Sequence, residues 1–240
     1  MNSVELQKID QGGDDFTFDV FGDNKGSTTV FETLLDKVNE DNALFALDNG
    51  DLVDGATIGN YRMFVGQIAA STGPFLTAVG NHDDGSSDLY HAIFGNDYYA
   101  FTAGNCYFIV LDDSNEKDID NVQLEWLKEK LDESQAYRFR FVFMHVPLYD
   151  PRVGPRGVGH SLQDPEFTGM LNSLLDQSHV TLLLTSHIHG YYEGTWGSTP
   201  YLVTGGAGAQ LQGADHQHFF YHYVRVHVSN QGEDYEVVKI

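Results

Sequence analysis

The chain has 240 residues, of which 41% are hydrophobic, and its 35 acidic and 13 basic residues give a formal net charge of −22. This length fits one large domain or two small ones, and 16 Phe and 13 Tyr can fill a sizeable core. The charge argues against nucleic acid as a partner. No apolar run approaches the roughly 20 residues that a membrane span needs.

The first 15 residues, MNSVELQKIDQGGDD, contain no apolar segment of the kind found in a signal peptide. The sequence as given therefore favours the cytoplasm, although an extracellular protein whose signal peptide had been removed would look the same. The lone Cys106 excludes an intrachain disulfide framework, and its apolar neighbours predict a buried thiol. The acidity fits either a high-salt cytoplasm or an ordinary acidic surface. Nothing in the sequence indicates an oligomeric state.

From residue 16 the chain alternates strand and helix patterns. After an expected strand at 16–22, apolar residues at helical spacing predict a helix within 27–41. The same order repeats with a strand at 43–48 and a helix within 60–71. This alternation is typical of an α/β protein.

The middle of the chain begins with a third expected strand at 75–79. A short segment at 88–95 follows it, and then 98–112 predicts a hairpin with Gly104 and Asn105 at its turn.

Two later helices have recognisable starts. Asp120 is placed to cap a helix over 121–134, and Asp164 followed by Pro165 is a strong helix start. Expected strands at 139–144 and 180–185 flank the Gly/Pro-rich loop that lies before Asp164.

From residue 191 onward the pattern is β, with strands expected in 199–206, 218–229 and 235–240. Together the elements predict two mixed β-sheets packed face to face with helices outside, a four-layer α/β/β/α sandwich. We expect residues 1–15 to form an N-terminal segment and residues 16–240 to form one domain.

Six potential metal ligands each come just after an apolar, strand-like run. Strands that end in ligands gather chemistry at one edge of a sheet. Carboxylate, amide and imidazole groups together suit divalent metals of borderline hardness. The six are Asp23, Asp51, Asn81, His145, His187 and His189. His187 and His189 are two residues apart and face the same way on an extended backbone, and a carboxylate such as Asp51 can bridge two ions about 4 Å apart.

Five short blocks occur in order: GDNKG at 22–26, GDLVD at 50–54, GNHD at 80–83, MHVP at 144–147 and SHIHG at 186–190. In this order they resemble the motifs of the calcineurin-like metallophosphoesterase superfamily. VTGGAGAQL at 203–211 is similar to a segment that follows in many members. The resemblance runs from about residue 16 to the C-terminus. It implies a hydrolase of phosphomonoesters or phosphodiesters with two divalent metal ions, manganese, zinc or iron.

The resemblance also implies a role for each residue. One metal would take Asp51, Asn81, His145 and His187, and the other Asp23, Asp51 and His189. A hydroxide bridging the two ions would attack phosphorus in line with the leaving oxygen. His82 would contact the phosphate and, when protonated, assist departure of the leaving group. Asp83 would orient the His82 ring, and a loop-capping carboxylate is the alternative for Asp83.

Lys25 departs from the family pattern, because it stands where the D-x-H block places a histidine ligand. A protonated ammonium cannot ligate a metal, so the metal at Asp23 would keep three protein ligands, which still describes an open catalytic site. Lys25 would then bind a substrate phosphate as a point charge. The alternative is a weak or absent metal on this side, and hence a single-metal or non-catalytic module that binds a phosphorylated ligand or partner.

The Gly/Pro-rich loop after His145 carries Arg152, Arg156 and His160. In a chain with few basic residues, these side chains are candidates to grip the phosphate of a small-molecule ester. Ordinary solvated surface is the alternative for all three.

Overall fold

The computed structural model describes residues 1–9, 13–85, 88–153 and 159–240. One sheet consists of β1 (Phe16–Phe21), β2 (Ala46–Asp48), β3 (Phe75–Thr77), β10 (His222–Val228) and β11 (Glu233–Lys239). Its strand order is β11-β10-β1-β2-β3, and β1, β2 and β3 run parallel while β10 is antiparallel to β1.

The other sheet has six strands in the order β4-β5-β6-β7-β9-β8. They are β4 (Tyr99–Ala103), β5 (Cys106–Val110), β6 (Phe139–Phe143), β7 (Leu182–Thr185), β8 (Tyr191–Trp196) and β9 (Thr199–Thr204). The strands β5, β6, β7 and β9 are parallel, and β4 and β8 pair antiparallel at the two edges. Both sheets are therefore mixed, as the sequence predicted.

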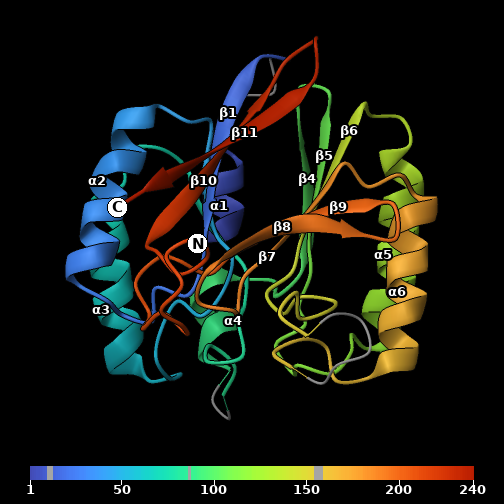
Figure 1. The fold of residues 1–240 in the computed structure, drawn as a ribbon. Helices are drawn as coiled ribbons and strands as arrows, with labels where there is room; N and C mark the ends of the chain where they lie inside the picture. The colour runs from blue at the N-terminus through green and yellow to red at the C-terminus, as the bar shows by residue number, and fades with distance from the viewer. Residues whose placement is uncertain (10–12, 86–87, 154–158) are drawn as a thin grey trace.

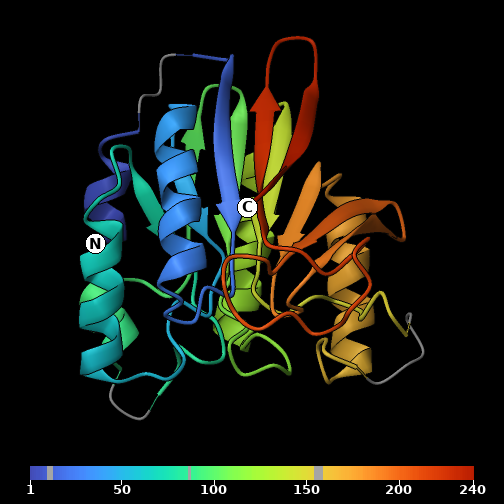
Figure 2. The same cartoon turned by 60° about the vertical axis from the view of Figure 1, so that its left-hand side comes forward.

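Helices cover the outer face of each sheet (Figure 1). The helices α2 (Thr29–Asp41) and α3 (Ile58–Ile68) lie against the first sheet, and α5 (Asn121–Ser134) and α6 (Pro165–Gln177) lie against the second. A 60° turn keeps the helices outside the strands (Figure 2). The predicted four-layer α/β/β/α sandwich is confirmed.

Aromatic side chains fill the space between the two sheets. Phe18 of β1 contacts Phe141 of β6 with ring centroids 5.1 Å apart, and Phe45 contacts Phe108 of β5 at 5.3 Å. All four side chains are fully buried. Such edge-to-face pairs add specific geometry to apolar burial, so they help to fix how one sheet lies on the other.

The local signals predicted at three places are confirmed. The side chain of Asp120 accepts a hydrogen bond from the backbone N–H of Gln123, and Asp164 caps α6 in the same way. The β4–β5 hairpin turns at Gly104 and Asn105, and Gly104 adopts a positive φ of 49°, which favours glycine.

The N-terminal segment contains a short helix, α1 (Asn2–Leu6), that the sequence analysis did not predict. The side-chain amide of Asn2 donates to the carbonyl of Thr77 at 3.0 Å, and its oxygen accepts from the N–H of Thr77 at 3.1 Å. A second short helix, α4 (Leu89–Phe94), follows β3. Within the described ranges, no helix is both long and apolar enough to cross a membrane.

Candidate metal centre

All six predicted ligands lie where strands of the two sheets end. Asp23, Asp51 and Asn81 follow β1, β2 and β3, which are parallel to one another. His145 follows β6, and His187 and His189 follow its parallel neighbour β7. Because parallel strands end at the same edge of a sheet, each sheet brings three of the six side chains to one place.

The first group of donor atoms comes from both sheets. One ligand atom each of Asp51, His145 and His187 lies within 4.8 Å of the others. The Oδ1 of Asn81 lies 3.0 Å from Nδ1 of His187 and 3.2 Å from Nε2 of His145, so this amide belongs to the same group.

A second group consists of Asp23, Asp51 and His189, again with ligand atoms within 4.8 Å of one another. The Nε2 of His189 lies 3.4 Å from Oδ1 of Asp23. Asp51 belongs to both groups, so a single buried carboxylate stands between them.

Two of the histidine rings are held in the orientation that a metal ligand needs. The Nδ1 of His145 lies 2.9 Å from the carbonyl oxygen of Asn49, and the Nδ1 of His189 lies 2.7 Å from that of Gln210. Because a carbonyl only accepts hydrogen bonds, each Nδ1 carries the hydrogen. Each Nε2 is thereby turned towards the carboxylates and is the ring atom that would bind a metal ion.

Unpaired buried atoms show that the second group fits a cation. Both carboxylate oxygens of Asp23 and the Nε2 of His189 are buried and have no hydrogen-bond partner among the described residues. An unsatisfied buried polar group costs about 1–3 kcal/mol. A divalent ion between these atoms would satisfy all three, so the residues present are suited to a metal.

The backbone is strained where these side chains are held. Asp23, Asp51 and His187 have positive φ angles of 62°, 58° and 66°, and Lys25 has 45°. Such conformations cost of order 1 kcal/mol each for a non-glycine residue and cluster at functional sites. Gly80 allows the close approach next to them, since a Cβ there would lie 2.2 Å from the backbone nitrogen of Asp51.

Asp113 is a site residue that the sequence analysis missed. Its buried carboxylate accepts hydrogen bonds from the backbone N–H groups of His145 and Val146, at 2.9 and 2.8 Å. It therefore fixes the turn that presents the His145 ring. An available signal was its position, because Asp113 also follows an apolar run, at 106–111.

The carboxylates determine the charge state of the centre. Burial by itself lowers the pKa of His145, but Asp51, Asp23 and Asp113 outweigh it and raise that pKa to about 10. Burial and the charge on His145 lower the pKa of His187 to about 2. Burial opposes ionisation of Asp51, yet His145 and Lys25 hold its pKa well below the usual range. The centre therefore has a strong affinity for positive charge.

Asp83 takes the loop-capping role rather than the one beside the His82 ring. Its carboxylate accepts from the backbone N–H groups of Gly80, Leu52 and Val53, at 2.9, 3.1 and 3.2 Å. The expectation that it orients His82 is thus corrected, because the carboxylate points under the loop. The ring of His82 is half-exposed instead, with Nδ1 3.1 Å from the carbonyl oxygen of Asp54.

Lys25 lies directly against the shared carboxylate. Its Nζ is 2.9 Å from Oδ2 of Asp51. With Ser27, Asp54 and His189, among others, it lines a hollow of about 410 Å³. The ammonium is thus inside the centre and also faces a space large enough for a substrate group.

The loop after His145 contributes a second hollow, of about 530 Å³, lined in part by Arg152, His160 and His189. The ring centroids of His160 and His187 are 5.6 Å apart. The guanidinium of Arg152 is already engaged, because Nη2 lies 2.6 Å from Oδ2 of Asp150. Arg156 lies outside the described residues.

Two face-to-face sheets that pool carboxylates and histidines around one shared aspartate define a metallophosphoesterase, a hydrolase of phosphoric ester bonds. Residues 16–191 match the family model described as calcineurin-like phosphoesterase, and the chain belongs to this family.

Individual proteins resemble the chain more distantly. Rat (Rattus norvegicus) serine/threonine-protein phosphatase CPPED1 is 23% identical over 239 residues, covering 88% of this chain and 72% of that protein. A purple acid phosphatase from yellow lupin (Lupinus luteus) seeds superposes with a TM-score of 0.75 at 17% identity, over 95% of this chain and 52% of that one. A dimetal phosphatase from Danio rerio gives a TM-score of 0.67 at 15% identity, over 93% and 98%. The chain thus spans about half of the lupin protein, and these structural matches show the shared fold.

Proposed function

We propose that the protein hydrolyses phosphomonoesters or phosphodiesters with two divalent ions that share Asp51. Asn81, His145 and His187 would complete the site of one ion, and Asp23 and His189 that of the other. The observation that carries the proposal is that Asp51 belongs to both groups of converging donor atoms. Ions bound there would neutralise the charge of a phosphate ester and acidify water for attack on phosphorus.

His82 is the residue proposed to handle the leaving group. Its backbone N–H donates to Oδ1 of Asp51 at 2.9 Å, which places the residue at the rim of the centre. Because Nδ1 faces the carbonyl of Asp54, Nε2 is the ring atom left to contact the phosphate and to donate a proton to the leaving oxygen.

The two hollows beside His189 are proposed to receive the substrate. Lys25 would contact, as a point charge, an oxygen of a phosphate bound in the first hollow. His160 lines the second hollow. Arg152 would form part of the wall of the second hollow, while its guanidinium stays paired with Asp150. The name of the rat relative adds phosphoserine and phosphothreonine peptides to the small esters worth testing.

A hydrolysis screen tests this function. The purified protein is assayed with p-nitrophenyl phosphate and its bis ester, with added manganese, zinc or iron, and its metal content is measured by mass spectrometry. Asp51→Asn is expected to lower kcat by at least about 10³-fold and His82→Ala by about 10²-fold. Asp132→Asn, a change at an exposed aspartate on α5 outside the centre and the two hollows, is the matched control. Full activity in Asp51→Asn at unchanged thermal stability would rule out the shared-carboxylate mechanism.

The Lys25–Asp51 ion pair favours a second candidate function, a single-metal module that binds a phosphorylated ligand without hydrolysing it. Metal stoichiometry of the wild type and of Lys25→His separates the two. Two ions in both proteins support the hydrolase. One ion in the wild type and two in Lys25→His support the binding module, because the ammonium then excludes an ion that an imidazole would hold.

A further inference from the structure

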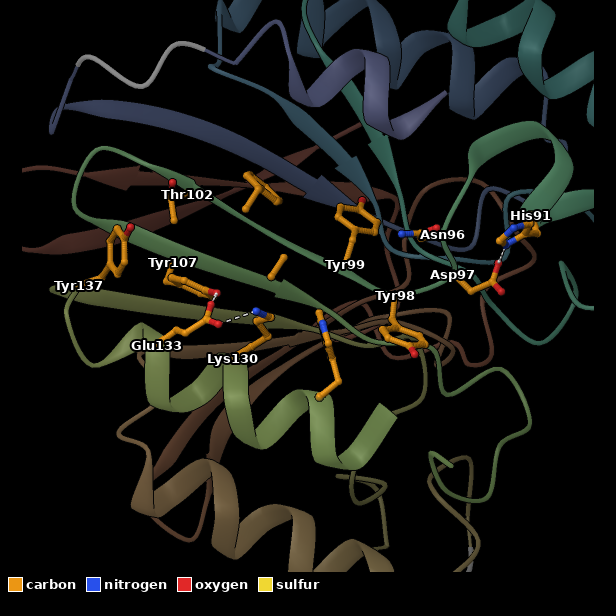
Figure 3. A pocket seen from close by; sticks show the side chains of 13 residues that line it. His91, Asn96, Asp97, Tyr98, Tyr99, Thr102, Tyr107, Lys130, Glu133 and Tyr137 are labelled. Carbon is orange, nitrogen blue, oxygen red and sulfur yellow. Dashed lines mark hydrogen bonds and ion pairs between the residues drawn. The ribbon is translucent and has the colours of Figure 1, made fainter. Parts of the chain in front are cut away.

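A separate pocket of about 730 Å³ lies at the β4 edge of the six-stranded sheet, beside α5 (Figure 3). This volume is typical of small-molecule sites. None of its lining residues belongs to the two hollows beside His189 or to the metal centre. The function proposed for the metal centre therefore does not account for this pocket.

The walls of this edge pocket are unusually aromatic. Six rings line it: Tyr98, Tyr99, Phe101, Tyr107, Trp126 and Tyr137. Figure 3 shows Tyr107 and Tyr137 at one end and His91 and Asp97 at the other, with Lys130 of α5 and then Tyr98 between them. The centroids of Tyr98 and Trp126 are 4.9 Å apart with their planes at 61°, so these two half-buried rings meet as a corner.

Carboxylates accompany the rings. Glu133 is already matched, because Lys130 Nζ lies 2.6 Å from its Oε1 and the hydroxyl of Tyr107 donates to its Oε2 at 2.6 Å. Asp97 faces only the ring of His91, whose Nδ1 is 3.6 Å from Oδ1, among the ion pairs of the described residues. The pocket therefore holds two carboxylates, Asp97 and Glu133, but only one ammonium, that of Lys130.

The size, the rings and the charge together select a ligand. Aromatic faces attract cations through their quadrupole, and Tyr and Trp are the strongest partners. The excess carboxylate and the net charge of −22 act in the same direction and disfavour an anion. We propose that the edge pocket binds a small organic cation of the alkylammonium class, with its charged head in the corner of Tyr98 and Trp126 near Asp97.

The test compares a charged probe with its neutral isostere. Choline and 3,3-dimethylbutan-1-ol differ in replacing the quaternary nitrogen by carbon, so a difference in their affinity reports the charge. Titration calorimetry and the fluorescence of Trp126 follow binding at matched ionic strength. Saturable binding of choline is expected, with the neutral alcohol about tenfold weaker, as for a partly desolvated cation–π contact.

Two variants separate the rings from the carboxylate. Trp126→Leu and Asp97→Asn are each expected to weaken choline binding by about fivefold to tenfold. Tyr235→Leu, an exposed tyrosine outside the pocket, should leave choline binding unchanged, as should Glu125→Gln on α5. Asp97→Asn keeps the test valid if Trp126→Leu folds poorly. Equal affinity for the alcohol and choline, no saturable choline binding, or wild-type affinity in Asp97→Asn would each overturn the proposal.

Discussion

Asp113 illustrates how a single carboxylate acts on the centre through the backbone. It accepts two N–H groups from the turn that carries His145, while its neighbour Asp112 bonds to Ser114 within its own loop. Both donors of the His145 turn are buried, so they have no water to replace a lost acceptor. The precision of the His145 ring therefore depends on a side chain that is not itself a proposed ligand.

We predict that Asp113→Ala lowers the free energy of unfolding by about 2–4 kcal/mol, because two buried N–H groups lose their partner. Metal affinity should fall as well, since the His145 ring loses its fixed position. Urea denaturation and metal titration measure the two effects. Asp132→Ala, an exposed aspartate on α5, is the control and should be within about 0.5 kcal/mol of the wild type. Wild-type stability in Asp113→Ala would show that the turn is held by other contacts.

Asp19 of β1 gives a pH-dependent contribution to stability away from the metal centre. It is fully buried, with Arg225 Nε 3.9 Å from its Oδ1 and the carboxylate of Asp41 close by. Burial, followed by repulsion from Asp41, raises its pKa to about 8 against the attraction of Arg225. A carboxyl group with a raised folded-state pKa stabilises the fold fully below its unfolded pKa of 3.8, and this contribution is lost as the pH rises towards 8.

Asp19→Asn should therefore be more stable than the wild type at high pH, with a difference that grows by about 2–4 kcal/mol between pH 5 and pH 8. The variant keeps the shape of the side chain and cannot ionise. Urea midpoints measured across this range, compared with Asp41→Asn, check the effect. A difference that does not change with pH would mean that Asp19 titrates normally.

At the scale of elements, the sequence predicted the helices and turns that carry a local signal such as a capping residue or a turn pair. The helices α5 and α6 begin at capping aspartates, and the β4–β5 hairpin turns at a Gly-Asn pair. The helix α1 escaped prediction because its five residues are too short to show a period, and contacts with β3 hold it in place. Tertiary contacts stabilise this helix, and the periodicity of its own sequence does not reveal such contacts.

The residues of the candidate centre also divide into those whose place the sequence predicted and those whose contacts it did not. Its six proposed ligands were identified because parallel strands end together, which is a property of the fold class. The partners of Asp83 and Arg152 depend on loop conformation, and the spacing of residues along the chain does not reveal that Asp83 turns under the 50–54 loop. The position of Asp113 after an apolar run was visible in the sequence, but its role of accepting backbone N–H groups was not, because that role depends on how the His145 turn folds.

The contact between α1 and β3 leads to a prediction at this scale. Asn2→Ala should lower the free energy of unfolding by about 1–3 kcal/mol, because the buried N–H of Thr77 loses its acceptor at the edge of the sheet. Hydrogen exchange should show faster opening of β3 in this variant. Asn115→Ala, in an exposed turn, is the control. Unchanged exchange at Thr77 would show that α1 adds nothing to the edge of β3.

At the scale of the whole molecule, the centre exists only while the two sheets are packed together. The amide of Asn49 donates to the carbonyls of Met144 and Leu184 at 2.9 and 3.1 Å, which joins the end of β2 to the ends of β6 and β7. The proposed ligands come equally from the two sides of this junction. Metal binding and sheet packing are therefore coupled, and each should stabilise the other.

The net charge of −22 acts on this packed structure as self-repulsion, which folding increases because it brings the carboxylates closer together. Salt screens such repulsion, with a Debye length of about 10 Å at 0.1 M and about 3 Å at 1 M. We predict that raising KCl from 0.1 to 1 M stabilises the protein by about 2 kcal/mol, or roughly 4–8 °C in Tm.

A variant with Asp36, Glu40, Glu129 and Asp132 changed to their amides provides the matched comparison. These four carboxylates are exposed and lie on the outer helices, away from the centre. The variant should be more stable than the wild type at 0.1 M KCl and should gain less from added salt, because fewer charges are left to screen. Melting curves in KCl, repeated in sucrose to remove the general effect of excluded solutes, measure both quantities. Equal salt dependence in the two proteins would show that repulsion among these carboxylates does not lower the stability of the fold.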